Sequence, residues 1–317
     1  MNHLWKSPLR AAVLVGLGAL LAMADTPQLG RPGALNYVEG TVSLNGRTVG
    51  PKAVGTLDLD PGQVLETGNG RAEILLTPGV FLRLGDQSAL KMISPSLTDT
   101  TVELQRGEAL VEVDQVRKEN HLDVVDHGVN TTLVKKGIYS FDASQPSVKV
   151  YDGKAVVAVD DRQIEVKKGK ELPLIAQAAL KPEKFDRNNE DSLYAWSKLR
   201  SEYMAEANAA SAQTIIAENP GWYYGTGWYW NPWFDSWAFV PGAGYIYNPF
   251  GFGFYSPGYF YYAPPVYYHG FGGYRGFHGG RYYGGFQGLH GGFRGTGGRP
   301  AAPAPLGGSG VHFGGRR

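Results

Sequence analysis

The stretch GNGRAEILLTPGVFLRLGDQSAL, residues Gly68 to Leu90, decides the fold of the first half of the chain. Its apolar residues alternate with others on both sides of Pro78-Gly79, which is a turn signal. Ala72, Ile74 and Leu76 share one face of the first arm, and Val80, Leu82 and Leu84 share one face of the second. The pattern predicts a β-hairpin whose arms bury one apolar face together. Gly68-Asn69-Gly70 before the hairpin and Gly85-Asp86 after it add turns, because Gly and Asn accept positive φ at low cost.

Similar turn signals recur about every ten residues as far as Lys168-Gly169, and Asn45-Gly46 is typical of a type I′ hairpin. The runs between them are short and rich in Val, Ile, Leu and Thr. Short strands without intervening helices predict an all-β sandwich, a barrel-like fold or a stacked β-roll.

Several of these steps resemble the FecR-like domain family. The matching motifs are Arg71 to Ile74, Val80 to Gly85 closing on Ser88-Ala89-Leu90, Leu104 to Ala109, and Val148 to Val159. The resemblance covers roughly residues 36–175 and implies a periplasmic β domain used for protein interaction or signal relay. In the best-known members, that domain helps an outer-membrane receptor to control a sigma factor. Gly137-Ile138-Tyr139-Ser140-Phe141 departs from the family's Gly-Thr-x-Phe step, which weakens kinship to the iron-signalling members.

The amino terminus has the anatomy of a secretory signal peptide. Lys6 and Arg10 precede an apolar run over residues 11–21, and Ala22-Met23-Ala24 offers a cleavage site before Asp25. The run is shorter than the roughly 20 residues that span a bilayer. We therefore expect residues 1–24 to be removed, no transmembrane helix to remain after cleavage, and the mature protein to reach the periplasm, cell surface or extracellular space. With so short a leader we do not expect direct regulation of a sigma factor.

Catalysis has little support in the sequence. The chain has no cysteine, which excludes thiolate chemistry, and it carries none of the common nucleophile or phosphate-binding motifs. His121, Asp123 and His127 lie close together, but no metal-ligand spacing accompanies them. We expect no catalytic residue, cofactor or metal, and therefore no enzyme.

Residues 186–218 are predicted to form a helical connector. Asn188 or Asn189 is the expected N-cap, and Asn219-Pro220-Gly221 ends the helix. Leu193, Trp196, Leu199 and Tyr203 follow at spacings of three, three and four, which predicts an apolar stripe. The stripe is expected either to pack on the β domain or to pair with a partner or a second copy.

Composition changes abruptly in residues 219–317, where most of the 45 Gly and 19 Tyr residues gather. Few aliphatic residues remain, so the sequence predicts a disordered Gly/Tyr/Trp/Pro-rich tail. Exposed Tyr and Trp rings and Arg suit multivalent adhesion or self-association, and the Arg-Gly pieces also resemble nucleic-acid-binding tracts. Export and a net charge of +1 argue against nucleic acid as a partner. The candidate interaction residues are Trp222, Trp228, Trp230, Trp233, Trp237, Trp196 and Tyr203.

The expected fold class is therefore mostly β: a FecR-like β-sandwich or β-roll over 36–175, one long helix, and a disordered tail. Three hypotheses follow for function. The first is an exported, non-enzymatic protein whose β domain binds envelope proteins or relays a signal, with an adhesive tail. The second is a structural, matrix or surface-adhesion protein that binds cell-wall or extracellular polymers through the tail. The third is a carbohydrate-binding module that uses the tail aromatics.

Overall fold

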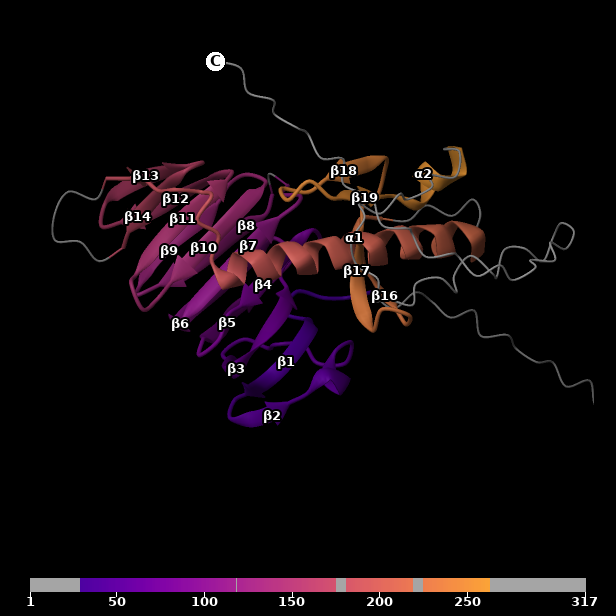
Figure 1. The fold of residues 1–317 in the computed structure, drawn as a ribbon, viewed down its shortest axis with the longest axis horizontal. Coiled ribbons are helices and arrows are strands. Elements are labelled where there is room, and N and C mark those ends of the chain that lie inside the picture. The colour runs from indigo at the N-terminus through magenta and orange to yellow at the C-terminus, as the bar shows by residue number, and fades with distance from the viewer. Residues whose placement is uncertain (1–28, 118, 175–180, 219–224, 263–317) are drawn as a thin grey trace, which may run out of the picture. The chain divides into compact units, whose positions relative to one another are not determined.

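The computed structural model describes residues 29–117, 119–174, 181–218 and 225–262 (Figure 1). The predicted signal peptide, Trp222 and residues 263–317 lie outside the described residues. No helix among the residues described is long and apolar enough to cross a membrane.

The predicted hairpin is present as β3 (Val64–Leu75) and β4 (Val80–Leu84). Ala72 pairs with Leu84 and Ile74 with Leu82 on the inner face, as expected. On the other face Glu73 pairs with Arg83, and Leu75 pairs with Phe81. The structure differs from the expectation here, because this second face is buried as well.

The hairpin lies inside one sheet of fifteen strands, in which β6 and β8 run parallel and link two groups of antiparallel strands. The order is β13-β12-β9-β8-β6-β5-β3-β4-β7-β10-β11-β14-β15, and β1 joins β2 to β3. The first elements are β1 (Leu35–Leu44), β2 (Arg47–Val49), the 3-10 helix η1 (Pro51–Ala53), β5 (Ala89–Pro95), β6 (Asp99–Arg106) and β7 (Glu108–Val113). The later ones are β8 (His121–Asp126), β9 (Val129–Leu133), β10 (Gly137–Asp142), β11 (Ser147–Asp152), β12 (Lys154–Val159), β13 (Arg162–Lys167), β14 (Lys170–Pro173) and β15 (Glu183–Lys184).

The sheet folds over a single apolar core that takes residues from both of its halves. Val111, Phe141 and Val148 come from the half that contains β4, β7, β10 and β11, and Val102, Val124 and Val157 come from the half that contains β6, β8 and β12. The β-rich fold class is therefore confirmed. The Asn45-Gly46 hairpin is confirmed too, with φ of 49° and 76° at its central residues and Leu44 paired with Arg47.

Helix α1 (Ser192–Glu218) follows, within the predicted connector. Its N-cap is Asp191, whose Oδ1 accepts a hydrogen bond from the Tyr194 backbone N–H at 2.7 Å, so the predicted cap at Asn188 or Asn189 is wrong. The expected stripe is also partly wrong, because Leu199 is 61% exposed. Steps of three residues turn 300° around a helix and so drift away from one face. Arg200 takes the buried position instead.

The outer face of the half-sheet formed by β3, β4, β7, β10 and β11, named the covered face, packs against α1. Leu110, Ile138 and Tyr151 on that face contact Leu193 and Trp196 near the start of the helix. Further along, Leu75 and Phe81 share a second core with Met204 and Ala207. The helix was expected either to pack on the β domain or to pair with a partner or a second copy, and these contacts match the first alternative.

The prediction of a disordered tail is wrong for residues 225–262. They form β16 (Gly227–Asn231), β17 (Ser236–Val240), β18 (Tyr245–Tyr247), β19 (Gly253–Tyr255) and α2 (Pro257–Tyr262). Trp228, Phe239 and Phe254 are almost fully buried and complete the core that Phe81 and α1 begin. Aromatic rings bury as much area as aliphatic side chains or more, so a segment without Leu still forms a core.

Candidate functional site

Three charged side chains lie on the covered face with no exposure to solvent. Arg83 on β4 is central: its Nε donates to Glu73 Oε2 and its Nη1 to Glu112 Oε2, each at 2.7 Å. Strand register brings the three together, because Glu73 is the direct cross-strand partner of Arg83, and Glu112 on β7 is opposite Phe81, two residues before Arg83 on the same face. Charges buried in this way are tolerated only when they are paired and hydrogen-bonded.

The helix adds two further polar side chains to this group. Arg200 Nη2 donates to Glu73 Oε1 at 2.9 Å, and its guanidinium lies 4.2 Å from the centroid of the Tyr37 ring. Ser201 Oγ donates to Glu112 Oε1 at 2.7 Å. The two carboxylates on the sheet therefore each hold one residue of α1, which fixes the rotation of the helix about its own axis.

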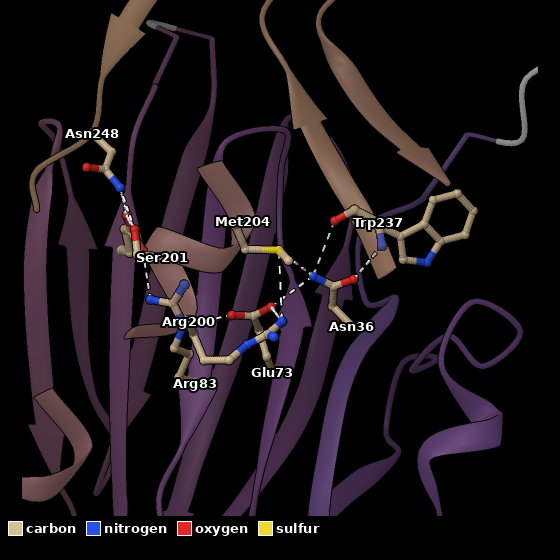
Figure 2. Close-up of polar contacts among 9 residues, drawn as sticks. Asn36, Glu73, Arg83, Arg200, Ser201, Met204, Trp237 and Asn248 are labelled. Carbon is tan, nitrogen blue, oxygen red and sulfur yellow. Dashed lines mark hydrogen bonds and ion pairs between the residues drawn. The ribbon is translucent and has the colours of Figure 1, made fainter. Parts of the chain in front are cut away.

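The first strand and the C-terminal strands reach the same group (Figure 2). Asn36 Nδ2 donates to Glu73 Oε1 at 2.8 Å, and Asn36 Oδ1 accepts from the Trp237 backbone N–H at 2.7 Å. Asn248 Nδ2 donates to Glu112 Oε1 at 2.6 Å and also to Ser201 Oγ. We call the set the polar cluster; its members are Asn36, Glu73, Arg83, Glu112, Arg200, Ser201 and Asn248.

Electrostatics favour ionised Glu73 and disfavour a further negative charge. Burial alone would raise the pKa of Glu73, but the guanidiniums of Arg200 and Arg83 outweigh it and lower the pKa to about 2. Asp114, at the end of β7, is fully buried beside the cluster, and burial followed by repulsion from Glu112 raises its pKa well above the usual range. Two guanidiniums thus face the Glu73 and Glu112 carboxylates, and the third acid is favoured in its neutral form.

The arrangement is suited to holding elements together rather than to reacting with a substrate. Every charged member is buried and hydrogen-bonded to another member of the cluster. No group of three or more potential ligand side chains that could hold a metal ion occurs in the described part of the chain. His121 is exposed on β8, Asp123 accepts from Thr132 Oγ1 at 2.5 Å, and His127 Nδ1 lies 2.6 Å from Asp126 Oδ1.

The predicted interaction residues are distributed between the interior and the surface. Trp228 and Trp237 are 1% and 3% exposed, so they belong to the core and are not open stacking surfaces. Trp230 is half-buried and packs edge-on against Trp237, whereas Trp233 is 71% exposed. Trp196 is buried under the Arg71 guanidinium, and half-buried Tyr203 packs on Phe234. Trp222 lies outside the described residues.

Sequence reasoning missed the polar cluster. Its members come from six parts of the chain separated by up to about two hundred residues, and no short motif joins them. A weak signal existed in the hairpin, because Glu73 and Arg83 stand opposite each other between apolar residues. A Glu-Arg pair is common on a sheet face that is exposed to solvent, so it does not indicate burial. This pair is buried because α1 packs over it.

The fold and the polar cluster define a class of protein: a folded-over β domain whose outer face is closed by its own C-terminal helix and aromatic strands. Residues 63–159 match the family model described as FecR protein, which confirms the resemblance inferred from the turn and strand motifs. The match runs from the residue before β3 to the end of β12 and does not include β1 or α1.

No curated protein matches the sequence. Two crystal structures of a proposed anti-sigma factor from Parabacteroides distasonis ATCC 8503 are similar to parts of the chain. The one at 1.65 Å resolution has 15% sequence identity and a TM-score of 0.36, and covers 43% of this chain and 64% of its own. The one at 2.50 Å has 12% identity and the same TM-score, and covers 57% and 99%. The chain thus spans about 64% of the length of the first structure.

Proposed function

We propose that this protein is an exported, non-enzymatic envelope protein whose FecR-like β domain binds other proteins and relays a signal through those contacts. The observation that carries the proposal is the family match over residues 63–159, which covers most strands of the sheet. Export is proposed from the signal-peptide pattern in residues 1–24. Residues 263–317 are proposed to add adhesion through their Arg, Tyr and Gly residues.

The covered face binds segments of the chain itself and is not open to a partner. It already holds a helix and four short strands by means of paired charges and aromatic packing, so it has the chemistry of a peptide-binding surface. Because the chain's own segments occupy this face, we place partner contacts elsewhere on the domain. Ile93 and Leu97, on and just beyond β5, are 40% and 53% exposed and are candidates.

Two measurements in the native host test the proposal. Mass determination of the mature protein should give an amino terminus at Asp25, in a periplasmic or outer-envelope fraction. A photo-crosslinking amino acid at Leu97 should then capture one defined envelope protein, whereas the same group at the exposed, charged Arg162 should not. Full-length protein in the cytoplasm, or identical products from both positions, would contradict the proposal.

Deleting residues 263–317 distinguishes the proposed protein-binding role from the hypothesis of a matrix protein that acts through its tail. This deletion leaves α1 and the strands to β19 intact, whereas removal from residue 220 would strip Trp228 and Phe254 from the core. Under our proposal the crosslink at Leu97 persists and surface attachment weakens. Loss of the crosslink together with attachment would favour a matrix protein in which the tail is the functional part.

A further inference from the structure

The chain has no charged residue between Asp235 and His269, although eight tyrosines fall in that interval. The described part of the interval, residues 236–262, contains β17, β18, β19 and α2. Lys136, which lies just before β10, donates a hydrogen bond from its ammonium to the backbone carbonyl of Tyr247. The surface built from this interval is therefore made by neutral side chains.

The small hairpin of β18 and β19 has two different faces. Ile246 pairs with Phe254, and both pack toward the core that contains Phe81 and Trp228. Tyr245 pairs with Tyr255 on the opposite face, and Tyr247 follows two residues later on the same side. The hairpin thus turns apolar residues inward and tyrosine rings outward.

The outward rings form a continuous group with rings of α2. Tyr245 and Tyr255 have centroids 6.3 Å apart and planes inclined by 33°, and Tyr255 and Tyr259 are 4.9 Å apart at 36°. Tyr247 stands edge-on to Tyr245 at 5.7 Å. Tyr245 and Tyr247 are 52% and 56% exposed. We name Tyr245, Tyr247, Tyr255 and Tyr259 the tyrosine surface.

The backbone beneath this surface is firmly held. Asn208 of α1 accepts from the Tyr255 N–H at 2.7 Å and donates to the Tyr255 carbonyl at 3.0 Å. Asn248, directly after β18, is bound to Glu112 in the polar cluster, and Ser256 N–H donates to the Gly244 carbonyl at 2.9 Å. A binding surface with fixed rings loses little conformational entropy when a ligand binds.

We propose that the tyrosine surface binds a neutral polysaccharide, by stacking of sugar rings on the phenol faces and hydrogen bonds to the phenol hydroxyls. Tyr245 and Tyr247 are each more than half exposed, and they adjoin the half-buried rings of Tyr255 and Tyr259 in one aromatic group, as is typical of an interaction surface. Residues 236–262 carry no cationic side chain, and the neighbouring Lys136 ammonium is bound to the Tyr247 carbonyl, so the surface offers few of the cations that the phosphates of nucleic acids and the carboxylates of acidic polymers need. The aliphatic faces of hexopyranose rings suit aromatic platforms, while their hydroxyl groups suit the tyrosine oxygens. The inference goes beyond the proposed protein interaction and does not depend on it.

The test uses the purified full-length chain with microcrystalline cellulose and chitin beads as neutral probes and heparin-agarose as the charged one. Wild type should bind at least one neutral polymer and be released by cellohexaose or chitohexaose. The Tyr245→Ala/Tyr247→Ala variant should bind that polymer about ten-fold more weakly, equivalent to ~1.4 kcal/mol. The Tyr245→Phe/Tyr247→Phe variant keeps the rings and should lose less affinity. Trp233→Ala, an exposed ring on another turn, is the matched control and should bind like wild type.

Four outcomes would overturn the proposal. The first is retention of wild type by neither neutral polymer, and the second is retention by heparin alone. The third is a double Ala variant that binds as strongly as wild type, with unchanged circular dichroism and urea midpoint. A wild-type dimer in sedimentation that becomes monomeric in the double Ala variant, with unchanged glycan binding, would assign the surface to self-association. Since all these measurements use purified protein, they succeed or fail independently of export and of the Leu97 crosslink.

Discussion

The guanidinium of Arg200 lies 2.9 Å from the carboxylate of Glu73, although 127 residues separate them in the chain. This ion pair joins the helix to the FecR-like domain, and Glu73 and Arg200 are 0% and 6% exposed. An ion pair in such a place is a requirement of the fold, because removal of either partner leaves the other charge buried and uncompensated.

Glu73→Gln should therefore destabilise the protein strongly. The substitution keeps the shape of the side chain but leaves Arg200 without a carboxylate partner and Arg83 with the carboxylate of Glu112 alone. We expect a loss of about 3–5 kcal/mol in the free energy of unfolding, measured in urea at pH 7. Glu103→Gln, which removes the exposed partner of Lys91, is the control and should change the value by less than about 0.5 kcal/mol.

The same variant has a pH signature. The pKa of Glu73 is lowered from 4.5 to about 2 in the folded protein, so its stabilising contribution is present above its unfolded pKa and is lost as the pH falls through about 2. The stability difference between wild type and Glu73→Gln should shrink over that interval. A constant difference would mean that the variant acts by packing and not by charge.

Asp114→Asn should stabilise the protein, increasingly so as the pH rises. The folded pKa of Asp114 is raised by burial and by Glu112, so the protein gives up stability as the pH rises from the unfolded pKa toward the folded one. An amide removes this dependence, and the gain should grow by about 1.4 kcal/mol per pH unit within that interval. Urea unfolding at pH 4, 6 and 8 measures it. A gain that is the same at all three values would contradict an uncharged Asp114 in the folded state.

Asn208→Ala should loosen the aromatic strands without unfolding the β domain. Asn208 makes three hydrogen bonds, one to the carbonyl of Phe239 and two to the backbone of Tyr255, and a buried group left unpaired costs about 1–3 kcal/mol. Hydrogen exchange should rise in residues 236–256 and stay unchanged in β8 and β12. Gln213→Ala, on the exposed side of α1, is the control. Equal protection in both variants would contradict this role for Asn208.

Gly55→Ala should disturb Trp230. Gly55 has φ of 83°, and a Cβ at this position would lie 2.5 Å from the Trp230 ring. Gly46→Ala is a matched control, since Gly46 has φ of 76° but open space around it. Both variants should show a strain cost of about 1 kcal/mol, with a further loss for Gly55→Ala alone. Equal thermal midpoints for the two variants would show that the ring moves aside freely.

Much of the β domain could be predicted because its signals are local. Strand alternation and the Asn45-Gly46 and Pro78-Gly79 turns depend on neighbouring residues, and the helix ends at Glu218, immediately before the predicted Asn219-Pro220-Gly221 stop. The buried face of α1 could not be predicted, since it carries Arg200, Ser201 and Asn208 where a core helix usually has aliphatic residues. Those residues are buried only because Glu73, Glu112 and the aromatic strands supply partners.

The ordered structure of residues 225–262 could not be predicted for a related reason. Low aliphatic content usually indicates disorder, yet this segment completes a core that begins on the hairpin and the helix. The same reasoning did not identify the tyrosine surface. With Trp228 and Trp237 in the interior, the rings that are more than half exposed are Tyr245 and Tyr247 on β18 and Trp233 in the turn between β16 and β17.

The polar cluster around Arg83 extends beyond the residues that match the family model. The family match covers residues 63–159 and includes Glu73, Arg83 and Glu112, but Asn36, Arg200, Ser201 and Asn248 lie outside it. A fragment limited to residues 63–159 would lack β1 and α1. It would therefore expose Glu73, Arg83, Glu112 and the Phe81 ring to water. A fragment that also contains β1, α1 and residues 225–262 should instead keep Glu73, Arg83 and Glu112 covered, because Asn36, Arg200 and Asn248 are then present.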